Sequence, residues 1–347
     1  MLAIVGALVE LSGCSKNLSL ADPAAPLSAP TRLCTENEGP PACRSAIEVE
    51  RLLGGDLELL SMNDTPSGSQ GAKILTLRAE GVVFRARWRA QSTSGLINEP
   101  RKELAAHAVQ RLFLDDDELV VPPTVAHCFP LSDYRRFAPD EKSSFAHVDC
   151  VLGFASYWLE RVKTVEAAED EDWIEKDTGI LDEELFEEDA LYRASVTKAN
   201  LLTFLINHGD AHGKQFMLER TPWGLRTYIV DNSIAFLSIK NPLLLLREDW
   251  SKIQVPALSK PAIARLKALS ERDIARLATI AELELHGRQL TLARGSAPHS
   301  QREPDGSAMS WTGARLRIGL TRSEIELVSS RIRELLARPD LNDLQGP

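Results

Sequence analysis

The sequence predicts an α+β protein with two lobes, in which a strand-rich first half precedes a helix-rich second half. In the first half, apolar side chains over residues 82–89 recur at every second position, which is the period of a strand. In the second half, Ser270 and Thr321 each begin a capping box, the side-chain pattern that starts many helices. The 347 residues are 44% hydrophobic and 26% charged, which is the composition of a folded chain and not of a mainly disordered one.

We expect the N-lobe to comprise residues 46–160 and to hold one helix among its strands. The helix is predicted over 99–113, because apolar residues there recur at intervals of three and four. A turn over 64–71 separates the first strands. The expected strands lie at 56–63, 73–89, 120–129 and 145–154.

An acidic insertion over 161–189 separates this lobe from a helical C-lobe over 190–340. Residues 166–189 hold thirteen acids and one base, a run that is typical of a solvated face. The C-lobe is expected to open with a helix over 190–206, followed by a loop at 207–215, a short strand at 215–219 and a strand ending at Val230. We expect helices from residue 243 onward, with a surface loop between them at 293–312.

Charge and hydropathy exclude several classes of protein. The chain has 40 Lys and Arg against 50 Asp and Glu, a net charge of −10, which argues against a nucleic-acid partner. No apolar run reaches the ~18 residues of a membrane-spanning helix. Collagen, coiled coils and small disulfide scaffolds are excluded by length and composition.

The N-terminal residues favour export. Residues 1–13 are mostly apolar, and Leu11-Ser12-Gly13-Cys14 resembles the lipobox of bacterial lipoproteins, in which the cysteine is acylated. This predicts a signal peptide over 1–13, a lipid anchor at Cys14 and a flexible tether over 14–45. Glu10 and the lack of a preceding Lys or Arg favour the alternative, a frayed apolar end of a cytoplasmic protein.

Four further cysteines are consistent with an exported chain, in which disulfides form readily. Cys34 and Cys43 would close a short loop. Cys128 and Cys150 lie on two extended segments that bracket a loop, so a hairpin would bring them opposite each other. In a cytoplasmic protein all four would remain reduced thiols.

The residues whose side chains could take part in a reaction lie in one loop and at the end of one strand. Asn207-His208-Gly209-Asp210-Ala211-His212-Gly213-Lys214-Gln215-Phe216 follows an apolar helix, and a hairpin then delivers Asp231-Asn232-Ser233-Ile234-Ala235-Phe236. Phosphoryl transfer needs such a set, because one carboxylate orients the acceptor hydroxyl while a second, with an amide oxygen, holds Mg²⁺ on nucleotide phosphates.

These motifs resemble those of HipA-like kinases, phosphatidylinositol 3- and 4-kinases and the secretory-pathway atypical protein kinases. Upstream, Glu99 to His107 is similar to the helix of their N-lobe, and Leu119 to Val125 to the strand segment after it. The resemblance covers roughly residues 56–290 and implies a two-lobed protein-kinase-like fold.

The resemblance implies a role for each matching position. Asp210 would be the catalytic carboxylate, and Asp231 a metal ligand together with Gln215, which stands where these kinases usually have Asn. Glu103 would be the N-lobe glutamate that orients a phosphate-binding cation, and His212 would brace the loop. Nucleotide contacts are implied for Lys214 and for a phosphate-covering turn that contains Gly68 and Gly71. The spacing of His107, His127 and His147 predicts no zinc site.

The sequence departs from these kinases in one respect: no strand lysine is present to pair with Glu103. The basic residues over 81–90 are all arginines, and Arg87 is the central one on the face that it shares with Arg85 and Arg89. Lys73 on the preceding strand is an alternative. A third possibility is that the fold persists without activity.

Three functions remain open. The first is an atypical kinase that uses ATP or another nucleotide with Mg²⁺ or Mn²⁺ to phosphorylate a hydroxyl of a protein, sugar or lipid. The second is a nucleotide-binding pseudokinase, and the third is a non-catalytic lipoprotein whose acidic run recruits a basic partner. We expect a monomer located in the periplasm, attached to the membrane only through Cys14.

Overall fold

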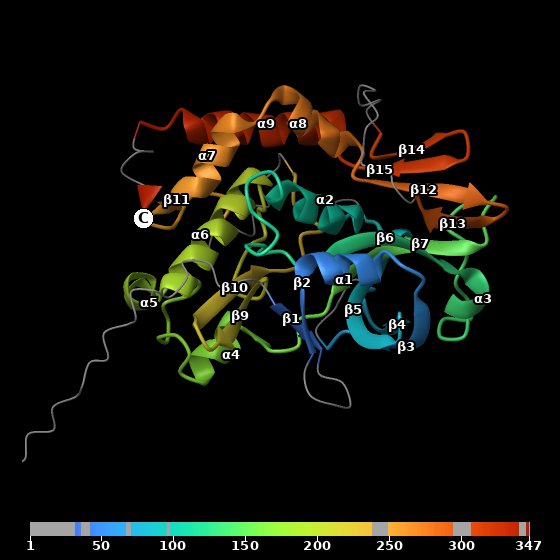
Figure 1. The fold of residues 1–347 in the computed structure, drawn as a ribbon, viewed down its shortest axis with the longest axis horizontal. Helices are drawn as coiled ribbons and strands as arrows, with labels where there is room; N and C mark the ends of the chain where they lie inside the picture. Colours follow the sequence, from blue (N-terminus) through green and yellow to red (C-terminus); the bar gives the residue numbers. More distant parts are fainter. Residues whose placement is uncertain are drawn as a thin grey trace, which may run out of the picture.

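The computed structural model describes residues 32–35, 42–66, 71–95, 98–237, 249–293, 307–339 and 345–346. These residues form a mixed α+β protein built around antiparallel sheets (Figure 1). Within this part of the chain, no helix combines the length and the apolar character that crossing a membrane requires.

A five-stranded antiparallel sheet occupies the first half, in the order β3-β4-β5-β7-β6. Burial in β5 has a period of two from Phe84 to Trp88: Phe84, Ala86 and Trp88 are buried in the core, and Arg85 and Arg87 between them are half-buried. The predicted strands are thus confirmed. Their bounds are β3 (Glu58–Asp64), β4 (Lys73–Ala79), β5 (Val82–Ala90), β6 (Thr124–Pro130) and β7 (Cys150–Tyr157).

Helix α2 (Arg101–Gln110) packs against β6 and β7, and the expected helix over 99–113 is therefore confirmed in a shorter form. Gln110, the last residue of α2, binds the segment that leads from this helix to β6. The Gln110 side chain accepts hydrogen bonds from the backbone N–H groups of Val120 (2.9 Å) and Val121 (2.8 Å), and donates one to the Val121 oxygen. Two short elements flank the sheet, η1 (Gln91–Thr93) and α3 (Leu131–Tyr134).

The prediction of a flexible tether over 14–45 is wrong for the described part of that segment. Strands β1 (Arg32–Thr35) and β2 (Ala42–Ser45) pair, and Leu33 is buried in the main core. Ser45 then begins helix α1 (Ala46–Leu53) through a capping box with Glu48. The signal peptide, Cys14 and residues 14–31 of the tether lie outside the described residues.

The acidic insertion is folded and partly buried. It contains β8 (Val162–Thr164), α4 (Val165–Asp170) and α5 (Glu183–Glu188). Asp182 is buried and caps α5, and Asp189 caps the following helix, α6 (Ala190–Leu205). The second Asp189 oxygen accepts from Leu225 N at 2.7 Å, which fixes α6 to the hairpin of β9 (Phe216–Thr221) and β10 (Gly224–Ile229). Acids that accept backbone hydrogen bonds thus build structure here.

The helical C-lobe predicted over 190–340 is wrong for residues 281–292 and 309–318, which form a four-stranded antiparallel sheet ordered β13-β12-β15-β14. In β12, Ala281 and Leu283 are buried and alternate with Glu282 and Glu284, so the pattern has the period of a strand. Cross-strand ion pairs between these glutamates and the arginines of β15 stabilise the pairing. The strands are β12 (Ala281–His286), β13 (Gln289–Leu292), β14 (Met309–Thr312) and β15 (Arg315–Ile318).

The apolar face of this second sheet covers β6 and β7, at the right of Figure 1. Of the surface loop expected over 293–312, residues 309–312 form strand β14, and residues 294–306 lie outside the described part. The capping boxes at Ser270 and Thr321 are confirmed. The remaining elements are β11 (Leu258–Ser259), α7 (Lys260–Ala268), α8 (Glu271–Ala275), η3 (Arg276–Ala278), α9 (Arg322–Leu336) and β16 (Gln345–Gly346).

The predicted disulfide between Cys128 and Cys150 is present, with 5.4 Å between the two Cα atoms. It joins β6 to the start of β7 at diagonal positions of the antiparallel register. The register of β1 and β2 sets Cys34 directly opposite Cys43.

Candidate functional site

A cavity of about 190 Å³ lies where β5, α2 and the β9–β10 hairpin approach one another. One end is charged and contains Arg87, which contacts both Glu103 and Asp231, and Lys214 is a further charged residue of the lining. The other end is mostly apolar, and its lining includes Val121, Tyr157, Trp158, Leu159, Val162, Met217 and Ile229. An apolar wall with a few convergent polar groups is typical of small-molecule sites, although the volume lies below their usual range of roughly 300–1,000 Å³.

Arg87 joins the two carboxylates at the charged end. Its Nη1 lies 2.9 Å from Oε1 of Glu103, and its Nη2 lies 2.9 Å from Oδ1 of Asp231. The contact predicted between Arg87 and Glu103 is therefore present. The Arg87 side chain retains 18% exposure, whereas Glu103 retains 6%, so Arg87 is the more accessible residue of this pair.

A second arginine on the same strand face strengthens the network. Nη1 of Arg89 lies 3.4 Å from Oδ1 of Asp231 and donates to Oγ of Ser233 at 2.5 Å. Ser233 in turn donates to Asp231 Oδ1 at 3.0 Å. Burial alone would raise the pKa of Asp231, but Arg87 and Arg89 outweigh it and lower the pKa to about 2. Asp231 is therefore an anion at neutral pH.

Backbone contacts hold the Asp231 segment against α2. Glu103 Oε2 accepts from the backbone N–H of Asn232 at 2.9 Å, and the backbone N–H of Glu99 donates to the backbone oxygen of Ser233 at 2.8 Å. Asp231 has a φ of 61°, in the left-handed region that non-glycine residues seldom adopt. Strained backbone of this kind is concentrated at functional sites.

The loop over 207–215 meets the Asp231 segment on the other side. Nε2 of the buried His208 donates to the backbone oxygen of Asp231 at 3.2 Å, and Val230 N donates to the Gln215 oxygen at 2.9 Å. In the amide orientation that gives hydrogen-bond partners to both its oxygen and its nitrogen, the Gln215 side-chain nitrogen lies 3.3 Å from the backbone oxygen of Asp210. It lies 3.1 Å from the backbone oxygen of His212. Gln215 and Asp210 therefore lie together, but neither lines the cavity.

The predicted nucleotide-binding residues differ in whether they lie at the cavity. Lys214 lines the cavity. Lys73 does not reach Glu103, because its Nζ pairs with Asp64 at 2.6 Å across the β3–β4 hairpin. That alternative to Arg87 is wrong. Gly71 has a φ of +75°, which suits a tight turn, and Gly68 lies outside the described residues.

Four contributors were missed at the level of sequence. Thr65 and Pro66 line the cavity from the turn after β3, and Trp158 lines it from the end of β7. The turn was visible in the sequence, but only tertiary structure shows which of its residues overhang a cavity. Ser233 could have been found, because it follows Asp231 and Asn232 directly.

The residues present fit a divalent cation only in part. In the described part of the chain, no group of three or more His, Cys, Asp or Glu side chains is arranged to hold a metal. Asp231 offers a carboxylate, yet its Oδ1 is already paired with two guanidinium groups. The Gln215 amide is turned toward the loop. A metal would therefore depend on Asp231 and on phosphate oxygens of a ligand.

Comparison with known proteins adds no family: neither family models nor curated protein sequences match this chain. The functional argument therefore rests on the geometry of the site.

Proposed function

We propose that the cavity is the nucleotide site of an atypical kinase-like phosphotransferase. The single observation that carries this proposal is Arg87, whose guanidinium bridges Glu103 and Asp231 at the charged end of an otherwise apolar cavity. A helix glutamate that orients a strand cation toward phosphates, facing a carboxylate from a second segment, is the arrangement that phosphoryl transfer uses.

The proposal includes two lobes. The five-stranded sheet with α2 would form the N-lobe over 46–160, and α6 with the β9–β10 hairpin would begin the C-lobe over 190–340. Support comes from the cavity lining, which draws on β5 and α2 as well as on residues 214–232. The sheet of β12 to β15 would be an addition to the C-lobe that also covers the N-lobe strands.

Each residue has a role in this proposal. The apolar wall receives the base of ATP or of another nucleotide, and Arg87 and Lys214 bind its phosphates. Mg²⁺ or Mn²⁺ would be held by Asp231, with Gln215 contributing after its amide turns, and would neutralise phosphate charge. Asp210 accepts the proton of the acceptor hydroxyl, on a protein, sugar or lipid.

The test is nucleotide binding followed by transfer. Binding to the native state raises the free energy of unfolding by about 2.7 kcal/mol at a ligand concentration of one hundred times Kd. We expect thermal shifts with ATP for the wild type and for Asp210→Asn, and metal-dependent phosphate transfer for the wild type alone. Arg87→Ala should abolish the shift. Arg78→Ala is the matched control, since Arg78 on the neighbouring β4 pairs with Glu58 at an exposed position. An unchanged shift in Arg87→Ala would refute the proposal.

A second candidate, a pseudokinase that binds nucleotide without transfer, has its own support. Two guanidinium groups already neutralise Asp231, and the Gln215 amide is engaged by its own loop. A metal-independent thermal shift without any transfer would favour this candidate.

Export remains part of the proposal, with Cys14 as the lipid anchor and the periplasm as the location. Radiolabelled palmitate incorporated by the wild type and not by Cys14→Ala would support it. A disulfide such as Cys128–Cys150 is typical of exported proteins.

A further inference from the structure

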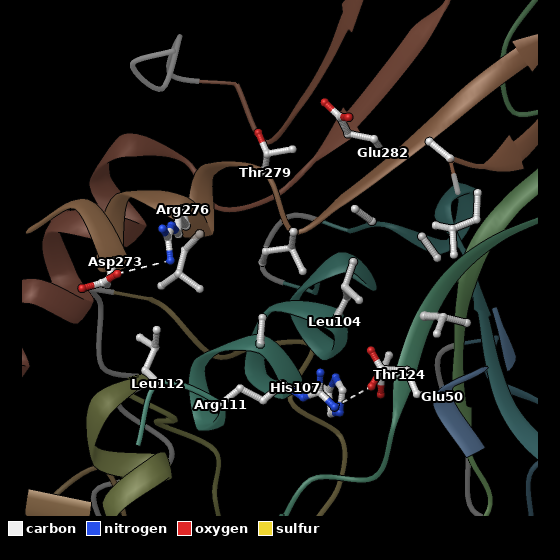
Figure 2. Close-up of a pocket in the computed structure, with 18 of the residues that line it drawn as sticks. Glu50, Leu104, His107, Arg111, Leu112, Thr124, Asp273, Arg276, Thr279 and Glu282 are labelled. Atoms are coloured by element: carbon white, nitrogen blue, oxygen red, sulfur yellow. Dashed lines mark hydrogen bonds and ion pairs between the residues drawn. The ribbon is translucent and has the colours of Figure 1, made fainter. Parts of the chain in front are cut away.

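A second and larger cavity, of about 550 Å³, is also lined by residues of α2 (Figure 2). Glu103 of this helix faces the small cavity, whereas Leu104 and His107 line the large one. Its other walls come from β6 and from the chain between Leu269 and Ala293. The volume falls within the range of small-molecule sites, roughly 300–1,000 Å³.

His107, which lines this cavity, has a ring nitrogen without a hydrogen-bond partner. The residue is 3% exposed, and its Nε2 has no hydrogen-bond partner. Burial, with the nearby Arg111 charge, lowers the pKa of His107 to about 3, so the imidazole is neutral at physiological pH. A buried polar atom without a hydrogen-bond partner is unfavourable. A ligand group that supplies the missing hydrogen bond therefore makes the free energy of binding more favourable.

The charged side chains around the cavity are already paired. Arg111 contacts Glu50 at 2.6 Å and Asp116 at 3.0 Å. Arg276 contacts Asp273 at 3.3 Å, and Glu282 contacts Arg317 at 2.8 Å. A charged ligand would have to break one of these pairs, so the lining favours a neutral one. The remaining wall is largely apolar, with Leu104, Leu277 and Leu292 among its members.

We propose that this cavity is a second ligand site, which binds a neutral and mostly apolar small molecule through one hydrogen-bonding group that pairs with Nε2 of His107. The apolar body of the ligand packs on the leucines of α2, η3 and β13. The site is separate from the proposed nucleotide site, because the two cavities share no lining residue.

The experiment compares two probes of almost the same shape. Naphthalene offers only an apolar body, and 2-naphthol adds one hydroxyl that can donate to or accept from an imidazole nitrogen. In fluorescence titrations of the full chain, 2-naphthol should bind the wild type about tenfold more tightly than naphthalene, which is the effect of one buried hydrogen bond. His107→Phe retains an aromatic ring and should reduce this ratio to about one.

A blocking variant makes the test independent of how His107→Phe folds. Ala108 is half-buried at the cavity, and Ala108→Phe should fill it and weaken both probes at least tenfold. ATP binding serves as the control for both variants, since neither residue lines the small cavity. Equal affinity of the wild type for the two probes, absence of binding of either, or 2-naphthol binding that survives Ala108→Phe would overturn the proposal.

Discussion

At the scale of single residues, the arginines of β5 show how far a sequence pattern can be taken. Strand periodicity predicted that Arg85, Arg87 and Arg89 share a face opposite the buried Trp88, and the resemblance to kinases implied that Arg87, as the central one, would meet Glu103. The contact is present at 2.9 Å. The partner on the far side, Asp231, lies 144 residues further along the chain, and periodicity in one strand carries no information about such a contact.

We expect Arg87→Ala to destabilise the protein by about 3–5 kcal/mol, because it leaves the buried Glu103 carboxylate without its cation. Arg87→Lys should recover at least half of that loss, since an ammonium retains the charge but cannot bridge two carboxylates as a guanidinium does. Urea unfolding at neutral pH measures both. Equal losses in the two variants would show that packing, and not charge, explains the contribution of Arg87.

Buried histidines make stability depend on pH. Burial lowers the pKa of His107 to about 3 and that of His208 to about 4, below the unfolded value near 6.5. Below pH 6.5 the unfolded chain therefore takes up protons that the folded chain does not, and the free energy of unfolding falls as the pH falls. Between pH 7.5 and 5.5 each histidine should account for a loss of about 1 kcal/mol.

The measurement is urea unfolding at pH 7.5 and 5.5 for the wild type, His107→Gln and His208→Gln. Each variant should lose about 1 kcal/mol less than the wild type between the two pH values. A variant with the wild-type pH dependence would show that its histidine titrates normally in the fold.

At the scale of elements, the sheet of β12 to β15 shows where sequence reasoning fails. Its strands are short, and two helix-starting signals, at Ser270 and Thr321, lie on either side of it. The alternation in β12 and β15 is present in the sequence but spans only a few residues each. The apolar face is stabilised by β6 and β7, which are more than a hundred residues away, so local patterns could not identify the strands.

The disulfide between β6 and β7 allows an element to be tested separately from the site. Replacing Cys128 and Cys150 together by alanine should lower the free energy of unfolding by about 3 kcal/mol, because a closed loop of this length restricts the unfolded chain. Chemical denaturation of oxidised wild type and double variant measures it. The difference should vanish when both are compared in reducing buffer, and a difference that persists would point to lost packing.

At the scale of the whole molecule, α2 connects parts of the chain that the sequence presents as separate lobes. Its Glu103 accepts from Asn232, and its Arg101 pairs with Glu324 at the start of α9 through two bonds of 2.8 and 2.9 Å. Figure 1 shows α9 lying along the same side of the molecule as α2. The resemblance to kinases implied that Asp231 would be a metal ligand and that Glu103 would orient a phosphate-binding cation, but no pattern predicted the contact of α2 with α9.

The ion pair between Arg101 and Glu324 yields a prediction about the cooperativity of the molecule. Both side chains are buried, at 3% and 9% exposure, and Arg101 also contacts Glu99 at 2.7 Å, so removal of Glu324 leaves the arginine with a second carboxylate partner. Glu324→Ala should therefore cost about 1.5–3 kcal/mol, the contribution of hydrogen bonds to a charged group, whereas Glu326→Ala, at an exposed position of the same helix, should change stability by less than about 0.5 kcal/mol. Because α2 contacts both the proposed nucleotide site and α9, we expect the wild type to unfold in a single transition. Tryptophan fluorescence and far-ultraviolet circular dichroism should then give the same midpoint, and both midpoints should shift together in Glu324→Ala. If the fluorescence and dichroism midpoints separate in the wild type, α2 does not couple the two halves, and Glu324 stabilises only the part of the chain around α9.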